Sequence, residues 1–170
     1  MKHKNLIKKL VHAVAILLII GLDQLTKMLA VSLLKPIDTF PILKNVLHLT
    51  YVENRGAAFG MLSNSRWVFM IISTLAILVM LVFLFSGKVP LIYEIPLIFM
   101  AAGGLGNMID RIALGYVVDF IDFRLINFAV FNGADSFVCV GSVLLVIAMI
   151  FDVDRENRKK KETKDTKNDN

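Results

Sequence analysis

The 170-residue chain contains a single cysteine, Cys139, which lies inside an apolar run. One cysteine allows neither an intrachain disulfide nor a cysteine metal cluster, so we interpret Cys139 as a small buried apolar residue. Histidines are also few: His3 and His12 lie near the N-terminus, far along the chain from His48. This spacing argues against a zinc site, so the cysteine and the histidines predict no metal and no cofactor.

Charged residues make up only 19% of the chain, below the about 25% of typical soluble domains. Apolar residues reach 56%, and the mean hydropathy is +0.69. A soluble protein of this length lacks the core volume to bury so much apolar surface. The composition therefore excludes an ordinary soluble domain and, outside the C-terminal tail, a disordered chain.

Four segments are long and apolar enough to span about 30 Å of hydrocarbon. The sequence therefore predicts an all-α membrane fold in one domain, residues 1–154. The spans are expected at about 11–34, 67–86, 89–110 and 135–152, with longer outer loops at about 35–66 and 111–134. The basic N-terminus also fits a signal peptide, but DQLTK follows its apolar run where a small-residue cleavage site would be needed, so we expect a retained span.

The net charge of +5 is concentrated at the two ends of the chain. Four Lys and Arg residues lie in 2–9 and seven in 155–167, which is typical of membrane-flanking charge rather than a nucleic-acid-binding face. Counting Lys and Arg on each side places both termini in the cytoplasm. We expect residues 155–170 to form a disordered basic tail near anionic lipid headgroups.

The first outer loop contains a short strand pattern. The stretch VLHLTYVE alternates, with Leu47, Leu49 and Tyr51 on one side of the strand. Pro41 and Asn45 are expected to bound it as turn residues. This pattern predicts a small extracytoplasmic β-sheet on the outer membrane surface.

Ionisable residues inside predicted spans are costly to insert and are therefore candidates for function. Asp23 and Lys27 are four residues apart on one helical face, so we interpret them as a structural ion pair. Glu94 lies near the cytoplasmic start of its span, where its side chain can extend toward water. Small residues close to the outer end of the same span are expected to allow close helix packing: Gly103, Gly104 and Gly106.

Four acidic residues, Asp110, Asp119, Asp122 and Asp135, lie within about 25 residues around the outer ends of the third and fourth spans. Two neighbouring carboxylates share a proton, and such a pair can activate water against a peptide carbonyl. Clustered carboxylates can instead hold a divalent metal or relay ions and protons. The residues alone therefore leave open an aspartyl protease, a small transporter or ion relay, a metal site and a structural subunit.

Five short motifs, taken together and in order, resemble lipoprotein signal peptidase, also called signal peptidase II. They are Asp23-Gln-Leu-Thr-Lys27, Asn54-Arg-Gly56-Ala-Ala-Phe59, Gly103-Gly-Leu-Gly-Asn107-Met-Ile-Asp110-Arg111, Val117-Val-Asp119-Phe120 and Phe131-Asn132-Gly-Ala-Asp135-Ser136. The resemblance covers about residues 10–152. Gly133 stands where the family often has a larger apolar residue.

The resemblance implies a bacterial four-span aspartyl endopeptidase of the cytoplasmic membrane, with its active site near the extracytoplasmic face. Its substrates would be prolipoproteins with a diacylglyceryl-modified cysteine, cut just before that cysteine. We expect it to act as a monomer among membrane lipids, without nucleic acid. By position, Asp119 and Asp135 match the catalytic aspartates, and Asp23 and Lys27 match structural supports. The remaining matches line or brace the site: Asn54, Gly56, Asn107, Asp110, Arg111 and Asn132.

Overall fold

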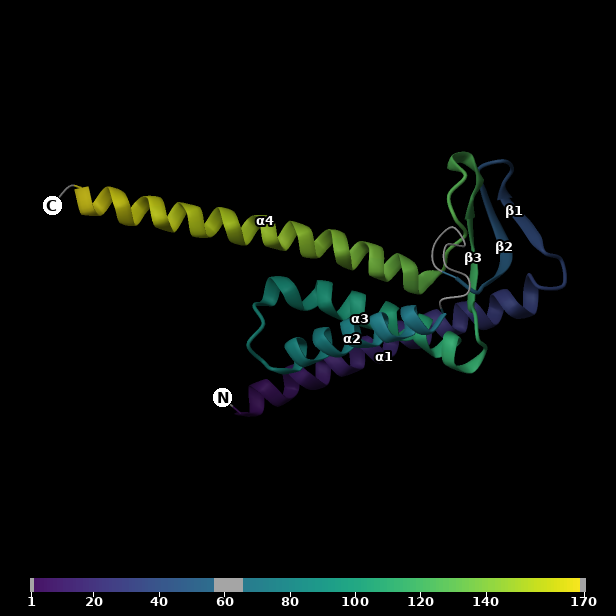
Figure 1. The fold of residues 1–170 in the computed structure, drawn as a ribbon, viewed down its shortest axis with the longest axis horizontal. Helices are drawn as coiled ribbons and strands as arrows, with labels where there is room; N and C mark the ends of the chain where they lie inside the picture. Colours follow the sequence, from purple (N-terminus) through teal and green to yellow (C-terminus); the bar gives the residue numbers. More distant parts are fainter. Residues whose placement is uncertain (1, 57–65, 169–170) are drawn as a thin grey trace.

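The computed structural model describes residues 2–56 and 66–168. In these ranges, helices lie side by side with a small antiparallel sheet at one end (Figure 1). The helices are α1 (Lys2–Leu33), α2 (Arg66–Phe85), α3 (Leu91–Ala113) and α4 (Gly133–Asn168). The strands, in sheet order β1-β2-β3, are β1 (Thr39–Leu43), β2 (Leu47–Asn54) and β3 (Val117–Phe123), followed by a 3₁₀ turn (Arg124–Ile126).

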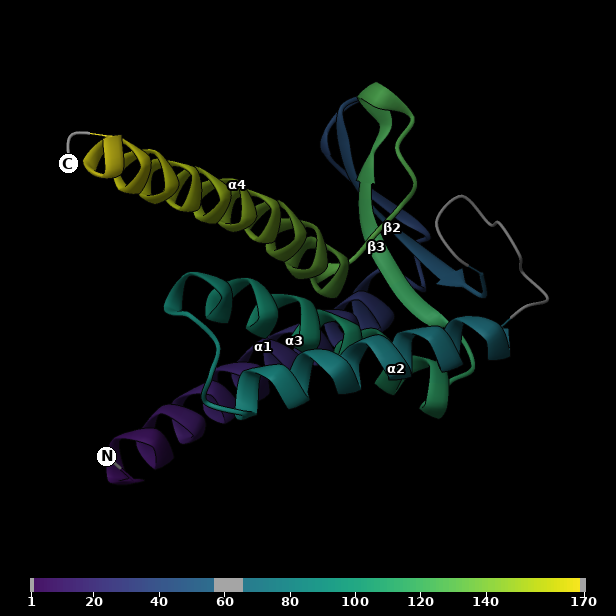
Figure 2. The same cartoon turned by 60° about the vertical axis from the view of Figure 1, so that its left-hand side comes forward.

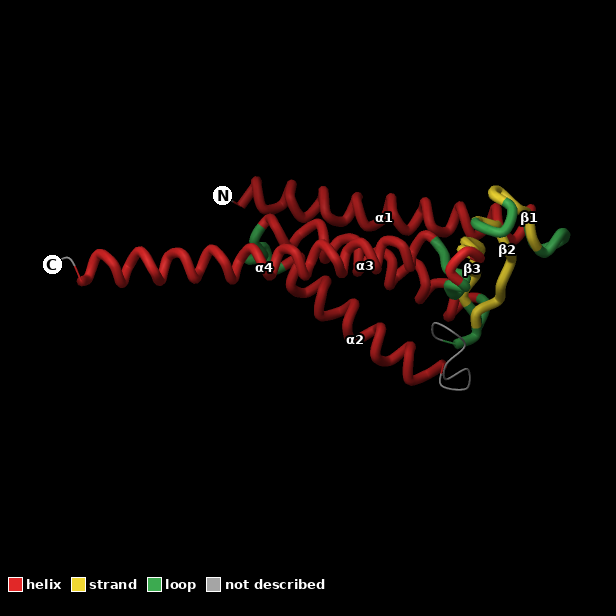
Figure 3. The backbone as a smooth tube through the Cα atoms, turned by 90° about the horizontal axis from the view of Figure 1, so that it is seen from above, coloured by secondary structure: helices red, strands yellow, loops and turns green. Residues whose placement is uncertain are grey.

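Helix α3 is the centre of the helical part, because it contacts each of the other three helices. Its contact with α4 is close: a Cβ on Gly103 would lie 2.4 Å from the carbonyl oxygen of Ala134, so no larger side chain fits there. The predicted packing role of this glycine is confirmed. Helix α2 diverges from α1 toward the sheet (Figure 3).

In the part of the chain that the structure describes, three helical stretches are long and apolar enough to cross a membrane: His3–Leu33, Leu91–Ala113 and Gly133–Arg155. The apolar part of α2, Met70–Phe85, is a helix where one was predicted but is shorter than a full span within the described residues. Large apolar side chains on the outer faces remain exposed, for example Leu17 at 66% and Val82 at 70%. Such surfaces need hydrocarbon as their solvent, which fits a membrane protein.

The sheet stands where α1 ends and α4 begins (Figure 2). The predicted strand is present as β2, but Pro41 lies within the edge strand β1 instead of bounding a turn. An edge position accommodates proline because its missing N–H is not needed by a further strand. Strand β3, which carries Asp119 and Asp122, occupies a segment that was expected to be a loop. It pairs with β2, and in this pairing Asp119 lies opposite Val52.

Two expectations about the end of the molecule away from the sheet differ from the structure (Figure 1). Residues 155–168 continue α4 as helix where disorder was expected. That segment has no Gly or Pro and contains five Lys, two Arg and two Glu residues, so a helix already formed continues at little cost. Glu94 is 4% exposed and does not extend toward water: it pairs with Lys8 and with His12 Nε2 at 3.0 Å. The Lys8 ammonium and the His12 ring, both on α1, are therefore the partners of this buried carboxylate.

Candidate functional site

Asp135 occupies the third position of α4, and local sequence explains how it is held. Asn132 precedes the helix and forms a reciprocal cap with it: the Asn132 Oδ1 accepts the Asp135 N–H at 2.9 Å, and the Asn132 N–H donates to Asp135 Oδ2 at 3.2 Å. This arrangement is a capping box. The positive end of the helix dipole also favours a carboxylate at this position.

Asp119 lies on β3 and is 1% exposed. The Asn132 Nδ2 donates to Asp119 Oδ1 at 2.6 Å, and the Asn54 Nδ2 donates to Oδ2 at 2.8 Å. Burial and the nearby charge of Asp135 raise the pKa of Asp119 to about 7. Near neutral pH this side chain is therefore poised to hold a proton.

Asn132 joins the two carboxylates, because its side-chain amide bonds Asp119 while its backbone N–H bonds Asp135. Asn107 on α3 completes the arrangement by donating from Nδ2 to Asp135 Oδ1 at 2.7 Å. Asn54, Asn107 and Asn132 thus come from β2, α3 and the α4 cap. They direct amide hydrogens onto two acids from β3 and α4.

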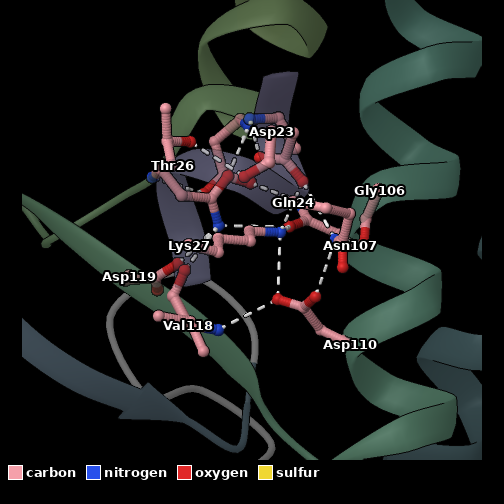
Figure 4. A network of polar contacts seen from close by, with 12 residues as sticks. Asp23, Gln24, Thr26, Lys27, Gly106, Asn107, Asp110, Val118 and Asp119 are labelled. Carbon is pink, nitrogen blue, oxygen red and sulfur yellow. Dashed lines mark hydrogen bonds and ion pairs between the residues drawn. The ribbon is translucent and has the colours of Figure 1, made fainter. Parts of the chain in front are cut away.

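Lys27 lies on the α1 side of this arrangement in a buried ionic network (Figure 4). Its Nζ is 2.9 Å from Asp23 Oδ2, 3.0 Å from Asp110 Oδ2 and 2.9 Å from Asn107 Oδ1. The predicted Asp23–Lys27 pair is therefore present, and it is one part of a larger network. Asp23 Oδ1 also accepts the Ala134 N–H at 2.9 Å, which ties α1 to the start of α4.

Asp110 supports β3 instead of facing the other acids. Its Oδ2 accepts the Val118 N–H at 3.1 Å, one residue before Asp119. Asp122 lies apart, where its Oδ2 accepts hydrogen bonds from Thr50 at 2.7 Å and Arg124 at 2.8 Å. The sequence could not choose between the four acids. In the structure, Asp119 and Asp135 are the two that accept hydrogen bonds from the same residue, Asn132.

A groove of about 540 Å³ opens beside Asp135. Asn54 and Arg111 supply polar groups, and the Gly56 N–H holds the Asn54 side chain through Oδ1 at 3.0 Å. Cys139 lines the groove and is exposed, so its interpretation as a buried residue is wrong. The rest of the wall is mainly apolar: Val117, Phe128, Ala129, Val130, Phe131, Val138 and Val140. A groove of this kind suits an extended apolar ligand with one polar reacting group.

Sequence reasoning missed two contributors. Gln24 donates to Asp110 Oδ1 at 2.9 Å and to the Gly106 carbonyl at 3.2 Å, so it locks α1 to α3. Phe131 pairs through its backbone with Ile121 and stacks on Phe123 at 6.0 Å, which shapes the groove wall. The position of Gln24 between Asp23 and Lys27 was a usable signal, whereas nothing local indicated the role of Phe131.

The chain was compared with known families and proteins. A family described as signal peptidase (SPase) II matches residues 15–151. A lipoprotein signal peptidase of Clostridioides difficile (strain 630) is 49% identical over 142 residues, covering 84% of this chain and 96% of that protein. A second, from Caldanaerobacter subterraneus subsp. tengcongensis, is 46% identical over 81% of this chain and 94% of that protein.

Solved structures agree with these matches. Two, each described as a bacterial membrane enzyme, superpose with TM-scores of 0.73 and 0.72 at 31% and 33% identity. The first alignment covers 84% of this chain and 89% of the solved chain, and the second covers 82% and 92%. The fold of this chain is therefore also found in bacterial membrane enzymes of known structure.

Proposed function

From the membership of this chain in the signal peptidase II family, whose model matches residues 15–151, we propose that it is an aspartyl endopeptidase of the membrane. It removes the signal peptide from diacylglyceryl-modified prolipoproteins by cutting just before the lipidated cysteine. The observation that supports the proposal is that Asn132 bonds both acids: its side-chain amide donates to Asp119, and its backbone N–H donates to Asp135.

The two acids have different surroundings, and these suggest their resting roles. Asp119 is buried, and its pKa is raised to about 7, so it carries the shared proton. Both acids accept hydrogen bonds at both oxygens, but only Asp135 also lies in the first turn of α4, where the positive end of the helix dipole favours the carboxylate. Asp135 is therefore the base, and Asp119 is the acid.

In the proposed reaction, a water held between the acids attacks the carbonyl carbon that precedes the lipidated cysteine. Asp135 accepts a proton from that water, while Asp119 donates its proton to the carbonyl oxygen as the C–O double bond opens. When the tetrahedral intermediate collapses, Asp119 recovers its proton and Asp135 gives its proton to the leaving amine. Arg111 and Asn54, on the groove wall, would bind the substrate backbone.

The proposed membrane placement uses α1, α2, α3 and α4 as four spans within a single domain, residues 1–154. From Leu91 to Asp110, α3 rises about 30 Å, so the acids lie one membrane thickness from its start. With both termini in the cytoplasm, this depth is the outer leaflet surface, where a diacylglyceryl cysteine is anchored. The acyl chains would stay in lipid beside a monomeric enzyme. The family match does not favour a transporter or ion relay.

The direct test is cleavage of a purified diacylated prolipoprotein, run beside its unlipidated form. We expect cleavage of the lipidated form alone, with the new N-terminus at the modified cysteine. Asp119→Asn and Asp135→Asn should each abolish it, whereas Asp122→Asn, on the same strand as Asp119 but outside the site, should remain active. Wild-type cleavage by either of the first two variants would refute the assignment. A loss of activity with chelator would indicate a metal-dependent reaction instead.

A further inference from the structure

Three asparagines each present an amide NH₂ group to the two acids, and each must be oriented correctly to do so. A side-chain amide donates from nitrogen and accepts at oxygen, so a half-turn would replace a donor by an acceptor. In every case the amide oxygen is held by a group that can only donate. The Gly56 N–H holds Asn54, the Asp135 N–H holds Asn132, and the Lys27 ammonium holds Asn107.

Lys27 differs from the other two holders, because it is a side chain that lies on another helix. Its Nζ is 2.9 Å from Asn107 Oδ1, and its side chain is 4% exposed (Figure 4). Asn132 Nδ2 also lies 3.1 Å from this oxygen, but it is within 3.3 Å of two further acceptors, the Val118 carbonyl and Asp119 Oδ1. Two hydrogens cannot serve three acceptors fully, so Lys27 is the dedicated donor to Asn107.

We propose that Lys27 is a positioning residue whose ammonium fixes the amide of Asn107 so that Asp135 is held as the catalytic carboxylate. This goes beyond its predicted role as a structural partner of Asp23, and it rests on the proposed function. With Asn107 as observed, its NH₂ donates to Asp135 Oδ1 at 2.7 Å. With the amide turned, two acceptor oxygens would face each other at that distance, and a proton on Asp135 would be required.

The consequence concerns the base. A turned amide favours protonated Asp135, so activity would need a higher pH to generate the carboxylate. Substrate contacts on the groove wall are unaffected, because Lys27 and Asn107 are not among its lining residues. The effect therefore falls on kcat and on the acidic limb of its pH profile rather than on KM.

The test removes the donor without changing the charge of the network. In Asp23→Asn/Lys27→Met, one negative and one positive group are lost together, so the double variant matches the wild type in charge. We expect the acidic limb of its kcat–pH profile to move to higher pH by about one unit. At acidic pH kcat should be about tenfold lower than in the wild type, and this difference should become smaller as pH rises. Lys27→Arg keeps both charge and donor and should retain the wild-type limb.

A second background separates positioning from general support. Asn107→Leu removes the amide through which Lys27 acts and should itself raise the acidic limb. Adding Asp23→Asn/Lys27→Met to it should then produce no further shift, because the route is already broken. Additive shifts, or an unchanged limb in the charge-matched double variant, would overturn the proposal. If that double variant does not fold, an unchanged acidic limb in Asn107→Leu would also overturn the proposal.

A readout without substrate keeps this inference distinct from the proposed function. Infrared titration of protonated carboxyl groups, assigned by comparison with Asp135→Asn, reports the protonation of Asp135 directly. We expect Asp135 to be protonated at higher pH in Asp23→Asn/Lys27→Met than in the wild type. If the wild type fails to cleave lipidated prolipoprotein, the function is wrong, while this titration still decides the role of Lys27.

Discussion

The molecule buries a charged cluster at each end of the α1–α3 contact, and only one of them resembles an active site. Near the N-terminus of α1, Glu94 meets Lys8 and His12; near its C-terminus, Asp23 and Lys27 meet Asp110. In both clusters the acidic side chains are almost fully buried. Burial of charge in an apolar bundle therefore does not by itself indicate catalysis.

The two clusters differ in how completely their polar atoms are hydrogen-bonded. In the Glu94 cluster, His12 Nδ1 is buried without a hydrogen-bond partner among the described residues. In the other cluster, Lys27 makes three polar contacts, and its network continues through Asn107 to Asp135 on the groove wall. A connected donor network ending on an accessible acid separates the candidate site from a structural ion pair.

The largest expected effect compares the acids of the two regions. Asp135→Asn should lower kcat by at least about a thousandfold, because it removes the base. Glu94→Gln should change kcat by less than about threefold, because Glu94 has no path to the groove. Both are measured as single-turnover cleavage of a lipidated prolipoprotein, with membrane levels of each variant as the control. Equal losses would remove the distinction between the regions.

The next effect concerns stability. Lys27→Met leaves Asp23 and Asp110 buried without their cation, which should cost about 3–5 kcal/mol of unfolding free energy. Lys8→Met should cost less than about 1 kcal/mol, because the Lys8 side chain is 37% exposed and His12 remains beside Glu94. Denaturant unfolding in detergent micelles measures both. A Lys8 variant as unstable as the Lys27 variant would contradict the comparison.

Two glycines, one facing Asp23 and one exposed on α1, should respond differently to alanine. A Cβ on Gly106 would lie 2.6 Å from Asp23 Oδ2, so Gly106→Ala should displace that carboxylate and cost about 1–3 kcal/mol. A Cβ on Gly21 of α1 would have no atom within 4 Å, so Gly21→Ala should be neutral or stabilise the helix by up to about 1 kcal/mol. Thermal unfolding of the two variants provides the comparison.

The last comparison concerns a pH dependence from Asp119. Its pKa is about 7 in the folded protein against 3.8 for an ordinary aspartate, so between these values the folded state binds more protons than the unfolded state. Stability from this group should therefore fall as pH rises from about 4 to 7, and activity should decline above about pH 7 as the acid ionises. Asp119→Asn should flatten this part of the stability curve. An unchanged slope in that variant would assign the dependence to another group.

Much of the fold was predictable, because apolar runs are local features. The helices around residues 11–34, 67–86, 89–110 and 135–152 and the strand β2 follow from them. Strand β3 was not predictable, because Val117–Phe123 forms a strand by pairing with β2 far away in sequence. The burial of Glu94 was missed for a similar reason: its partners Lys8 and His12 lie on another helix.

For the site, the types of side chain and their position near the ends of the apolar helices were set by the order of residues alone, because a helix of known length fixes how far apart its two ends lie. Which acids meet was decided by tertiary structure. The register of β2 with β3 turns Asp119 toward Asn54, and the close α3–α4 contact brings Asn107 to Asp135. Asp122, only three residues from Asp119, bonds Thr50 and Arg124 instead. Hydrogen bonds act over about 3 Å, so only the folded backbone can choose among acids that the sequence leaves equivalent.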